Sequence, residues 1–522
     1  MLKIKKLFIF SLIIIESFLF QQKNIMANII ISNFDDIGTV SDWEDKGGSS
    51  GITDISLYNF NGNNVLKVTA SNIPSSECIV GTYNLPTEAK NWNNVKYIKA
   101  KIFIPSSSIP DYYNESAALQ ARFYIKTGSS WQWAAMKGKG EAGMIALAPN
   151  KWTTIVGFPW EFKKTDGSTP NFSDVREIGI QIYAYNTNYS GDIYIDDIEI
   201  ITEPYSYSNV QNAVGFKIKG TTILDYNNSP FLIRGVNNPH IWFQEADNAL
   251  YEIKKTNANA VRIVWGTADN PYDVNRLKLA KVERLDSIIS KTLALKMIPI
   301  VEWHDITYLY SPGADIYKIT DAANYWVSDS VFPIIKKYEK YLILNIANEA
   351  GNWKTTPEEW ADNYKQAIDI IRSAGFHSLL MIDAPNWGKA IKPVVAKAQE
   401  LIEYDPDHNI VFDIHMYGYS VWNDSSTLDE YLGIIKDLNI PLVIGEFGYN
   451  YNNGNNNVNC KVDAIKVMEL CYKFKIGYIP WSWAGNDDAN SWLNMTDDWT
   501  LNTLTYWGNL VLNSEYGIKN TS

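Results

Sequence analysis

The sequence predicts an α/β protein in which a (β/α)8 barrel follows an all-β sandwich. Three observations lead to this prediction: the length of the chain, a change of pattern near residue 203, and eight apolar strands beyond that point. The chain has 522 residues, 46% of them hydrophobic, which is more than one ordinary domain holds. We therefore expect two folded domains.

The first 27 residues have the pattern of a secretory signal peptide. Three lysines in residues 1–6 precede an apolar stretch over residues 7–15, and the small residue Ala27 ends the segment. Glu16 interrupts the apolar stretch well short of the roughly 20 residues that a membrane span needs. We expect residues 1–27 to be cleaved, so that the protein is secreted to the extracellular space without membrane attachment.

Residues 28–202 predict a β-sandwich of the jelly-roll type. Short strands with alternating apolar and polar residues, such as Tyr97–Ile104 and Asp192–Ile200, are separated by turns rich in Asn, Gly, Ser and Pro. The segment 203–211 is polar and turn-rich, which indicates a linker between the domains.

Residues 212–522 predict the barrel, because apolar strands alternate there with helical segments such as Pro357–Ser373 and Thr427–Leu438. A further helix is expected over Asn275–Leu295, and Phe216–Asp225 has the pattern of a hairpin that closes the barrel floor. An open doubly wound sheet is disfavoured, because no Gly-rich nucleotide turn follows the first strand. The eight expected strands are Phe231–Val236, Ala260–Trp265, Met297–His304, Leu342–Asn348, Ser378–Asp383, Ile410–His415, Pro441–Glu446 and Gly477–Trp483.

Composition narrows the function. The net charge is -12 and no basic run occurs beyond the N-terminus, so we do not expect a nucleic-acid partner. Three cysteines give no disulfide framework. The 19 Trp and 32 Tyr residues have flat faces that suit stacking on sugar rings, although many of them are expected in the core.

Polar residues occur at the ends of most barrel strands, where the active site of such a barrel forms. Two of them, Glu349 and Glu446, follow the fourth and seventh strands and should face each other across the mouth. A retaining glycosidase needs such a pair of carboxylates at about 5 to 5.5 Å. The other strand-end residues are Arg262, His304, Asp305, Asn348, His415, Tyr417, Trp481 and Trp483.

Each of these side chains suits a step of glycoside hydrolysis. We expect Glu349 to be the general acid/base, because the negative charge of Glu446 favours its protonated form, and Glu446 to be the ionised nucleophile. Arg262 and Tyr417 would orient Glu446, and Asn348 would bind the sugar 2-hydroxyl. His304 and His415 would add hydrogen bonds.

A metal-dependent alternative takes His240, His304 and His415 as zinc ligands. No His-x-His pair ends the first strand and no His-Glu-x-x-His motif occurs. We therefore expect catalysis without a metal or another cofactor.

The motifs Leu344–Ala350, Asp413–Tyr417, Ile444–Gly448 and Pro480–Asn486 resemble those of glycoside hydrolase family five. Over residues 212–515 the chain is similar to the bacterial endo-β-1,4-mannanases of that family. This resemblance implies mannan or glucomannan as the substrate and Trp481 as the platform under the reacting sugar. It also implies flanking subsites at His240, Trp242, Asp305, Trp387 and Trp483.

One departure from the mannanases is Ala350, because they usually carry an aromatic residue directly after the acid/base. We expect this change to open the leaving-group side of the cleft.

The sandwich resembles the jelly-roll carbohydrate-binding modules of plant-wall hydrolases. Trp131 and Trp133 are expected on one strand face, as are Tyr183 and Tyr185, because side chains alternate along a strand. Either pair would stack on sugars if it faces outward and would belong to the core if it faces inward. Asp36 and Asp197 lie near the two ends of the domain and are candidate ligands of a structural calcium ion or, equally, solvated turn residues.

Two other functions fit the sequence. An endo-β-1,4-glucanase of the same family would have the same barrel and the same two glutamates. A non-catalytic polysaccharide-binding protein would use both domains without cleavage, which the intact carboxylate pair disfavours. We expect a secreted, monomeric endo-β-1,4-mannanase.

Overall fold

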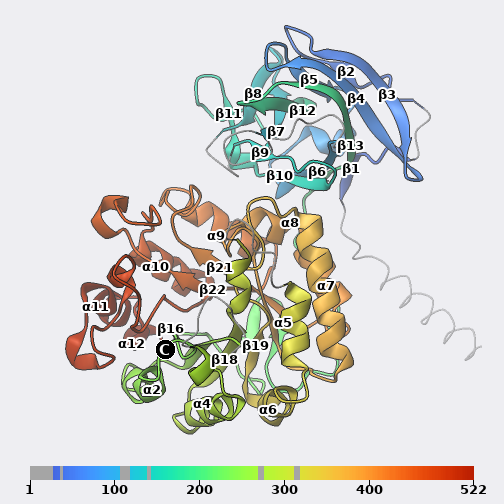
Figure 1. Cartoon of the computed structure of the whole chain (residues 1–522). Helices are drawn as coiled ribbons and strands as arrows, with labels where there is room; N and C mark the ends of the chain where they lie inside the picture. Colours follow the sequence, from blue (N-terminus) through green and yellow to red (C-terminus); the bar gives the residue numbers. More distant parts are fainter. Residues whose placement is uncertain (1–27, 36–38, 106–117, 138–142, 268–275, 311–317) are drawn as a thin grey trace, which may run out of the picture.

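The computed structural model describes residues 28–35, 39–105, 118–137, 143–267, 276–310 and 318–522. They form a β-sandwich that lies against one side of a helix-covered barrel (Figure 1). The expected signal peptide, residues 1–27, lies outside the described residues. Within them, no helix is both long enough and apolar enough to cross a membrane.

The sandwich consists of two antiparallel sheets that enclose an apolar core. One sheet contains β10 (Trp152–Gly157), β6 (Tyr97–Phe103), β13 (Tyr189–Ile201), β4 (Asn63–Ile73), β3 (Ile52–Phe60) and, paired with β13, β1 (Ile29–Ser32). The other contains β11 (Phe162–Lys164), β8 (Gln132–Met136), β7 (Ala118–Thr127), β12 (Val175–Tyr185), β5 (Cys78–Thr82), β2 (Glu44–Asp45) and, paired with β7, β9 (Ile145–Ala146). The predicted all-β fold of this half is confirmed.

The barrel is one parallel sheet in which each strand pairs with the next along the chain. A parallel bridge between Arg234 and Tyr478 joins its last strand to the start of its first. The strands are β16 (Gly235–Asn238), β17 (Ala260–Trp265), β18 (Ile298–Trp303), β19 (Ile343–Asn345), β20 (Leu380–Asp383), β21 (Ile410–Met416), β22 (Leu442–Phe447) and β23 (Gly477–Tyr478). The predicted (β/α)8 architecture is confirmed.

Amphipathic helices surround the barrel (Figure 1). The major ones are α2 (Ala246–Lys254), α4 (Val282–Ala294), α5 (Ile319–Trp326), α6 (Phe332–Tyr338), α7 (Pro357–Ser373), α8 (Ile391–Tyr404), α9 (Leu428–Asp437), α10 (Ala464–Phe474) and α11 (Tyr506–Asn513). Thr356 caps α7 by accepting a hydrogen bond from the Glu359 backbone, and Pro357 follows at the first helical position, where no backbone donor is needed.

Several element boundaries differ from the sequence prediction, and the fourth and eighth barrel strands are shorter than expected, at Ile343–Asn345 and Gly477–Tyr478. The first barrel strand covers Gly235–Asn238 rather than Phe231–Val236, so it ends two residues later. The helix expected over Asn275–Leu295 is divided into α3 (Arg276–Leu279) and α4 (Val282–Ala294), because Lys281 has an extended backbone and precedes the first turn of α4. Asn275 itself lies outside the described residues.

A short hairpin closes the barrel floor. β14 (Lys217–Lys219) and β15 (Thr222–Leu224) pair antiparallel, and their residues Ile218 and Ile223 share an apolar cluster with Ala260, Ile300 and Ile343 on the barrel strands. Polar chemistry is therefore restricted to the opposite end of the barrel.

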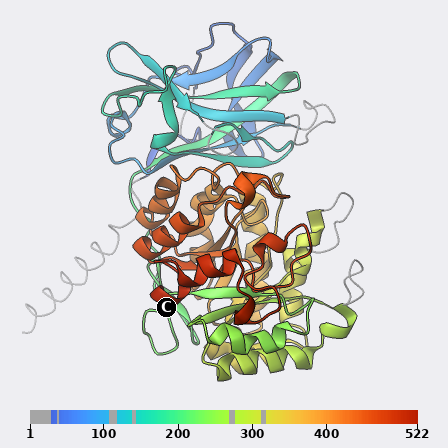
Figure 2. The same ribbon diagram turned by 90° about the vertical axis from the view of Figure 1, so that its left-hand side faces the viewer.

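The two domains pack against each other (Figure 2), and α7 and α8 of the barrel contact β10 of the sandwich. The buried Lys392 donates to the buried Glu161 of the sandwich at 2.9 Å, and Tyr431 donates to the same carboxylate at 2.9 Å. The expected linker 203–211 contains no helix or strand, and its Tyr205 is buried, with hydrogen bonds to the Tyr97 hydroxyl and the Val395 carbonyl. The sandwich is thus held against the barrel rather than tethered loosely.

Candidate active site

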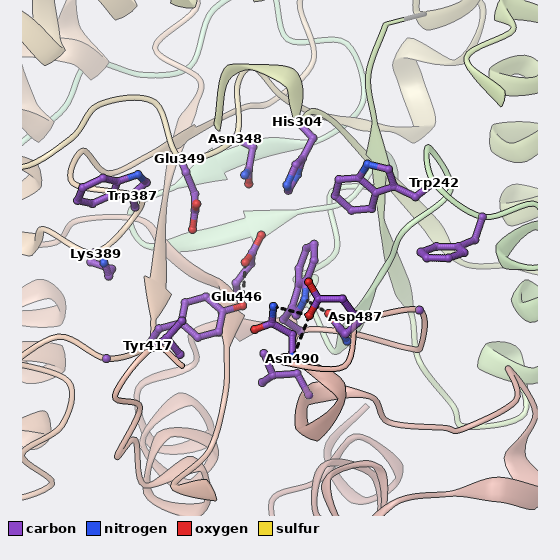
Figure 3. A pocket seen from close by; sticks show the side chains of 17 residues that line it. Trp242, His304, Asn348, Glu349, Trp387, Lys389, Tyr417, Glu446, Asp487 and Asn490 are labelled. Carbon is purple, nitrogen blue, oxygen red and sulfur yellow. Dashed lines mark hydrogen bonds between the residues drawn. The ribbon is translucent and has the colours of Figure 1, made fainter. Parts of the chain in front are cut away.

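A cleft of about 640 Å³ opens at the C-terminal ends of the barrel strands. Glu349 follows β19, and Glu446 lies near the end of β22. Both carboxylates point into the cleft (Figure 3), and their nearest oxygens are no more than 4.8 Å apart. In retaining glycosidases the two carboxyl groups lie about 5 to 5.5 Å apart, whereas in inverting enzymes they lie about 6.5 to 9.5 Å apart and leave room for a water molecule.

Glu446 accepts one hydrogen bond on each of its carboxylate oxygens. Arg262 donates from Nη1 to one carboxylate oxygen at 2.8 Å, and the Tyr417 hydroxyl donates to the other at 2.8 Å. Donors on both oxygens stabilise the ionised form and fix the direction of the carboxylate. The structure thus brings Arg262, Tyr417 and Glu446 together as the strand-end pattern suggests.

Arg262 is completely buried and is itself held by amide side chains. It donates to Asn237 at 3.0 Å, to Asn345 at 2.9 Å and to Asn348 at 2.7 Å. Because every nitrogen of the guanidinium has a partner, its position is determined by the barrel rather than by substrate.

Glu349 has a φ of +50°, in the left-handed region that non-glycine residues seldom adopt. Its backbone N–H donates to the buried carboxylate of Asp383 at 2.9 Å, which stabilises this conformation. The Glu349 side chain lies 2.9 Å from Nδ1 of His415. Positive φ values of this kind occur where the surrounding structure fixes a functional side chain.

His415 lies at the centre of the charged groups and is fully buried. Its Nδ1 faces Glu349 and, at 3.7 Å, Glu446, whereas Nε2 lies 3.6 Å from Asp383 and 3.7 Å from Asp413. Gly388 covers the ring, and a Cβ at that position would lie 2.6 Å from it. These negative neighbours outweigh burial and raise the pKa of His415 well above its usual value.

The charge on His415 determines the titration of the two glutamates. Burial favours a protonated Glu349, but the hydrogen bond and charge of His415 outweigh it and lower the pKa of that carboxyl. Burial raises the pKa of Glu446, although His415 and Arg262 oppose the shift. Both directions are the reverse of those expected from the sequence, because a linear pattern does not show which carboxylate a histidine contacts.

Aromatic side chains extend the cleft on both sides of the carboxylates. Trp481 lines the cleft and stacks on the ring of His304, at 5.8 Å between centroids. Trp242 lies at one end of the cleft, and Trp387 with Lys389 lies at the other, on the side of Glu349 (Figure 3). A linear, flat-faced ligand fits this arrangement.

Three predicted subsite residues do not line the cleft. His240 is buried and bonded to Asp247 at 2.8 Å, Asp305 is buried and accepts from Thr267 at 2.6 Å, and Trp483 is buried and donates to the Trp499 carbonyl at 3.0 Å. Position at a strand end does not reveal whether a side chain faces the mouth or the surrounding shell. Their contacts support the loops instead.

The histidine zinc site considered from the sequence is not assembled. His240 pairs with Asp247, His304 with Glu302 at 2.9 Å, and His415 with Glu349. Among the described residues, the carboxylate and histidine groups close enough to hold a metal are Glu349–His415–Glu446 and Asp383–Asp413–His415.

The cleft also contains residues that sequence reasoning missed. Phe243, Lys389, Asp487 and Asn490 line it. Asp487 and Asn490 lie in the loop after the eighth strand, which belongs to the barrel's active-site face, so their position was the available signal. Ala350, in contrast, is buried in the core and is not among the residues that line this cleft.

The aromatic pairs of the sandwich have different positions. Trp131 precedes β8 in a turn with a φ of +53° and is 43% exposed, whereas Trp133 stacks on Tyr124 at 4.0 Å. They therefore do not share one strand face as expected. Tyr183 and Tyr185, at alternate positions of β12, are 40% and 44% exposed and do share an outer face.

Of the two candidate calcium ligands, only Asp197 lies within the described residues. Asp36 lies outside the described residues. Asp197 is 2.6 Å from the ammonium of Lys101, so its carboxylate already has a cationic partner. Calcium binding stays a prediction.

A two-carboxylate cleft at the mouth of a (β/α)8 barrel, with an arginine and a tyrosine on one carboxylate, defines a glycoside hydrolase. In agreement, a family described as cellulase (glycosyl hydrolase family 5) matches residues 224–487. The chain belongs to glycosyl hydrolase family 5. A second family, described as mannanase, galactose-binding domain-like, matches residues 26–197.

Curated relatives and solved structures agree with this assignment. A mannan endo-1,4-β-mannosidase of Cellvibrio japonicus is 34% identical over 316 residues, which cover 60% of this chain and 69% of the relative. One of Salipaludibacillus agaradhaerens is 32% identical over 311 residues, 59% of this chain and 94% of the relative. The mannohexaose complex of a Thermomonospora fusca β-mannanase is 32% identical with a TM-score of 0.53, covering 59% of this chain and 98% of that structure.

Proposed function

We propose that this glycoside hydrolase is a secreted, retaining endo-β-1,4-mannanase that acts on mannan and glucomannan. The observation that carries the mechanism is the separation of at most 4.8 Å between carboxylate oxygens of Glu349 and Glu446. The names of the relatives support the substrate.

In the first step, Glu446 attacks the anomeric carbon and the bond to the leaving sugar breaks. Arg262 and Tyr417 hold Glu446 in the orientation needed for attack. Glu349 transfers its proton to the departing glycosidic oxygen, which becomes the hydroxyl of the released chain. The product of this step is a glycosyl ester of Glu446.

His415 provides a means of returning the proton to Glu349. The two groups are 2.9 Å apart, so a proton on Nδ1 can move to the carboxylate without any rearrangement of the chain. Binding of a neutral sugar displaces water from the cleft, and burial then favours the uncharged Glu349. Glu349 thus becomes the acid when substrate is bound.

In the second step, a water molecule replaces the leaving chain. Glu349, now ionised, removes a proton from the water, whose oxygen attacks the anomeric carbon as the ester bond to Glu446 breaks. Two inversions at one carbon restore the β configuration. Glu349 regains its proton, and Glu446 regains its negative charge.

The extent of the cleft on both sides of the carboxylates supports cleavage of bonds inside a polysaccharide chain. Aromatic residues continue on both sides of the carboxylates, with Trp242 at one end and Trp387 at the other (Figure 3). Sugar units therefore have contacts on both sides of the bond to be cleaved. Within the sandwich, the exposed Tyr183 and Tyr185 are the candidate polysaccharide-binding pair.

The test is release of reducing sugar by the mature protein from linear mannan, glucomannan and carboxymethyl cellulose. We expect cleavage of both mannans and little of the cellulose. Glu349→Ala and Glu446→Ala should each lower kcat about 1,000-fold or more. Preference for cellulose would make the protein a glucanase, and no cleavage of any substrate would support a binding function alone.

A further inference from the structure

A second cleft of about 250 Å³, the interdomain cleft, lies between the sandwich and the barrel. Gln120 and Thr153 contribute to its wall from the sandwich, and Trp353, Asn386 and Tyr419 contribute from the barrel. Its lining combines two aromatic rings with amides and a hydroxyl. Sugar-binding sites have this chemistry, because rings stack on the apolar faces of a hexose and amides bond to its hydroxyls.

Two amide side chains in this cleft have no hydrogen-bond partner within the described part of the chain. Gln120 reaches the cleft from β7, and Asn386 reaches it from the loop after β20. Polar groups in a partly enclosed site normally find a partner in the protein, in water or in a ligand. They lie on walls from opposite domains, so a ligand between them would contact both.

The interdomain cleft and the catalytic cleft share one wall. Trp387 and Lys389 line the catalytic cleft, while their chain neighbours Asn386 and Ala390 line the interdomain cleft. The loop that follows Glu349 also joins them, because the Trp387 backbone donates to the Gly351 carbonyl at 2.8 Å. Trp353 lies in the same loop.

The second cleft is on the leaving-group side of the scissile bond. Glu349 protonates the departing oxygen, so the leaving sugars must lie beside it, and Trp387 and Lys389 are at that end (Figure 3). A chain that runs past Trp387 reaches the interdomain cleft. The cleft continues onto the sandwich, because Gln120 is the cross-strand partner of the exposed Tyr183, and directly paired residues share a sheet face.

We propose that the interdomain cleft binds a main-chain hexose unit of the polysaccharide on the leaving-group side, between Gln120, Trp353 and Asn386. The sandwich is then part of an extended substrate groove and not a separate anchor. Rigid attachment of the domain through the buried Lys392–Glu161 pair keeps the two walls at a constant separation. This proposal rests on the proposed polysaccharide-cleaving function.

The experiment compares kcat/KM for linear mannan with kcat/KM for mannotriose in the full chain. We expect Gln120→Ala and Trp353→Ala each to lower the polymer-to-trisaccharide ratio about 2- to 10-fold, as loss of one hydrogen bond or stacking contact does. Gln132→Ala, an exposed glutamine of the same sheet, and Tyr472→Ala, an exposed aromatic on α10, are matched controls. Thermal unfolding of every variant verifies that it is folded.

Unchanged ratios in both Gln120→Ala and Trp353→Ala would overturn the proposal, and so would a loss seen with galactomannan but not with linear mannan. A loss of equal size in the controls would also contradict it. Wild-type specificity tests the proposed substrate separately. If the wild type cleaved cellulose instead of mannan, the same ratio with cellulose and cellotriose would still test the cleft.

Discussion

The Nδ1 atom of His415 lies 2.9 Å from a carboxylate oxygen of Glu349, and the same atom lies 3.7 Å from Glu446. One imidazole therefore contacts the acid/base directly and faces the nucleophile. Its hydrogen bond is the largest influence that lowers the pKa of Glu349, and its charge is the next largest. The behaviour of the site with pH should depend on it.

Replacement of His415 by Gln should shift the pH profile of kcat/KM. Gln keeps a hydrogen-bond donor but carries no charge, so the burial of Glu349 is opposed less strongly and the pKa of Glu349 rises. The basic limb, which reports loss of the acid's proton, should move to higher pH while the maximum rate falls. An unchanged basic limb would show that His415 does not govern the protonation of Glu349.

Asp383 should make folding stability depend on pH. Burial and the nearby charge of Asp413 raise the pKa of Asp383 from 3.8 to about 7. The folded protein then holds a proton that the unfolded chain has lost, so the free energy of unfolding should fall as pH rises between these two values, with a slope approaching about one proton. Asp383→Asn should reduce this slope, which chemical denaturation at several pH values measures.

Asp383 also accepts a hydrogen bond from the backbone N–H of Glu349. The change in slope is therefore interpreted only for a variant that keeps this hydrogen bond. The amide can still accept that hydrogen bond through its oxygen. A variant with the wild-type slope would show that another group takes up the proton.

Removal of one partner of the Lys392–Glu161 ion pair should destabilise the protein more than removal of both. Lys392→Met leaves the buried Glu161 with Tyr431 and a backbone N–H but no cation, and burial already raises the pKa of Glu161. We expect a loss of about 3 to 5 kcal/mol in the free energy of unfolding. The double variant Lys392→Met/Glu161→Leu should recover much of it, and a double variant as unstable as the single one would contradict this explanation.

Azide should distinguish the two glutamates. In Glu446→Ala the space of the missing nucleophile lies opposite the leaving group, so azide attack gives an α-glycosyl azide. In Glu349→Ala the covalent intermediate still forms with a good leaving group, and azide then gives the β-glycosyl azide. Product configuration by NMR verifies the roles, and the reverse pattern would exchange them.

Much of the active site could be predicted because parallel strands bring their C-terminal ends together. This rule alone predicts that Arg262, Asn348, Tyr417 and the two glutamates lie at the mouth, and in the structure they lie together there. Asp383 was missed as a support of Glu349, since a carboxylate at the end of an apolar strand gives no sign of what it binds. The contact of His415 with Glu349 is not predicted for the same reason, because the end of a strand does not show what its side chain binds.

The predictions that differ from the structure concern side chains whose positions depend on tertiary contacts. Trp131 and Trp133 follow the alternation of a strand, but the left-handed backbone of Trp131 places it in a turn before β8. The polar segment around Tyr205 has the composition of a free linker, yet its tyrosine is buried against the barrel. No local pattern specifies such a docking surface.

The proposed reaction is a double displacement in which Glu446 is the nucleophile and Glu349 is the acid/base. The most direct measurement is the anomeric configuration of the first product of mannohexaose hydrolysis, followed by NMR before mutarotation. The short separation of the two carboxylates predicts that the new reducing end appears first as the β anomer. Initial appearance of the α anomer would contradict the account, because it would require direct attack by water.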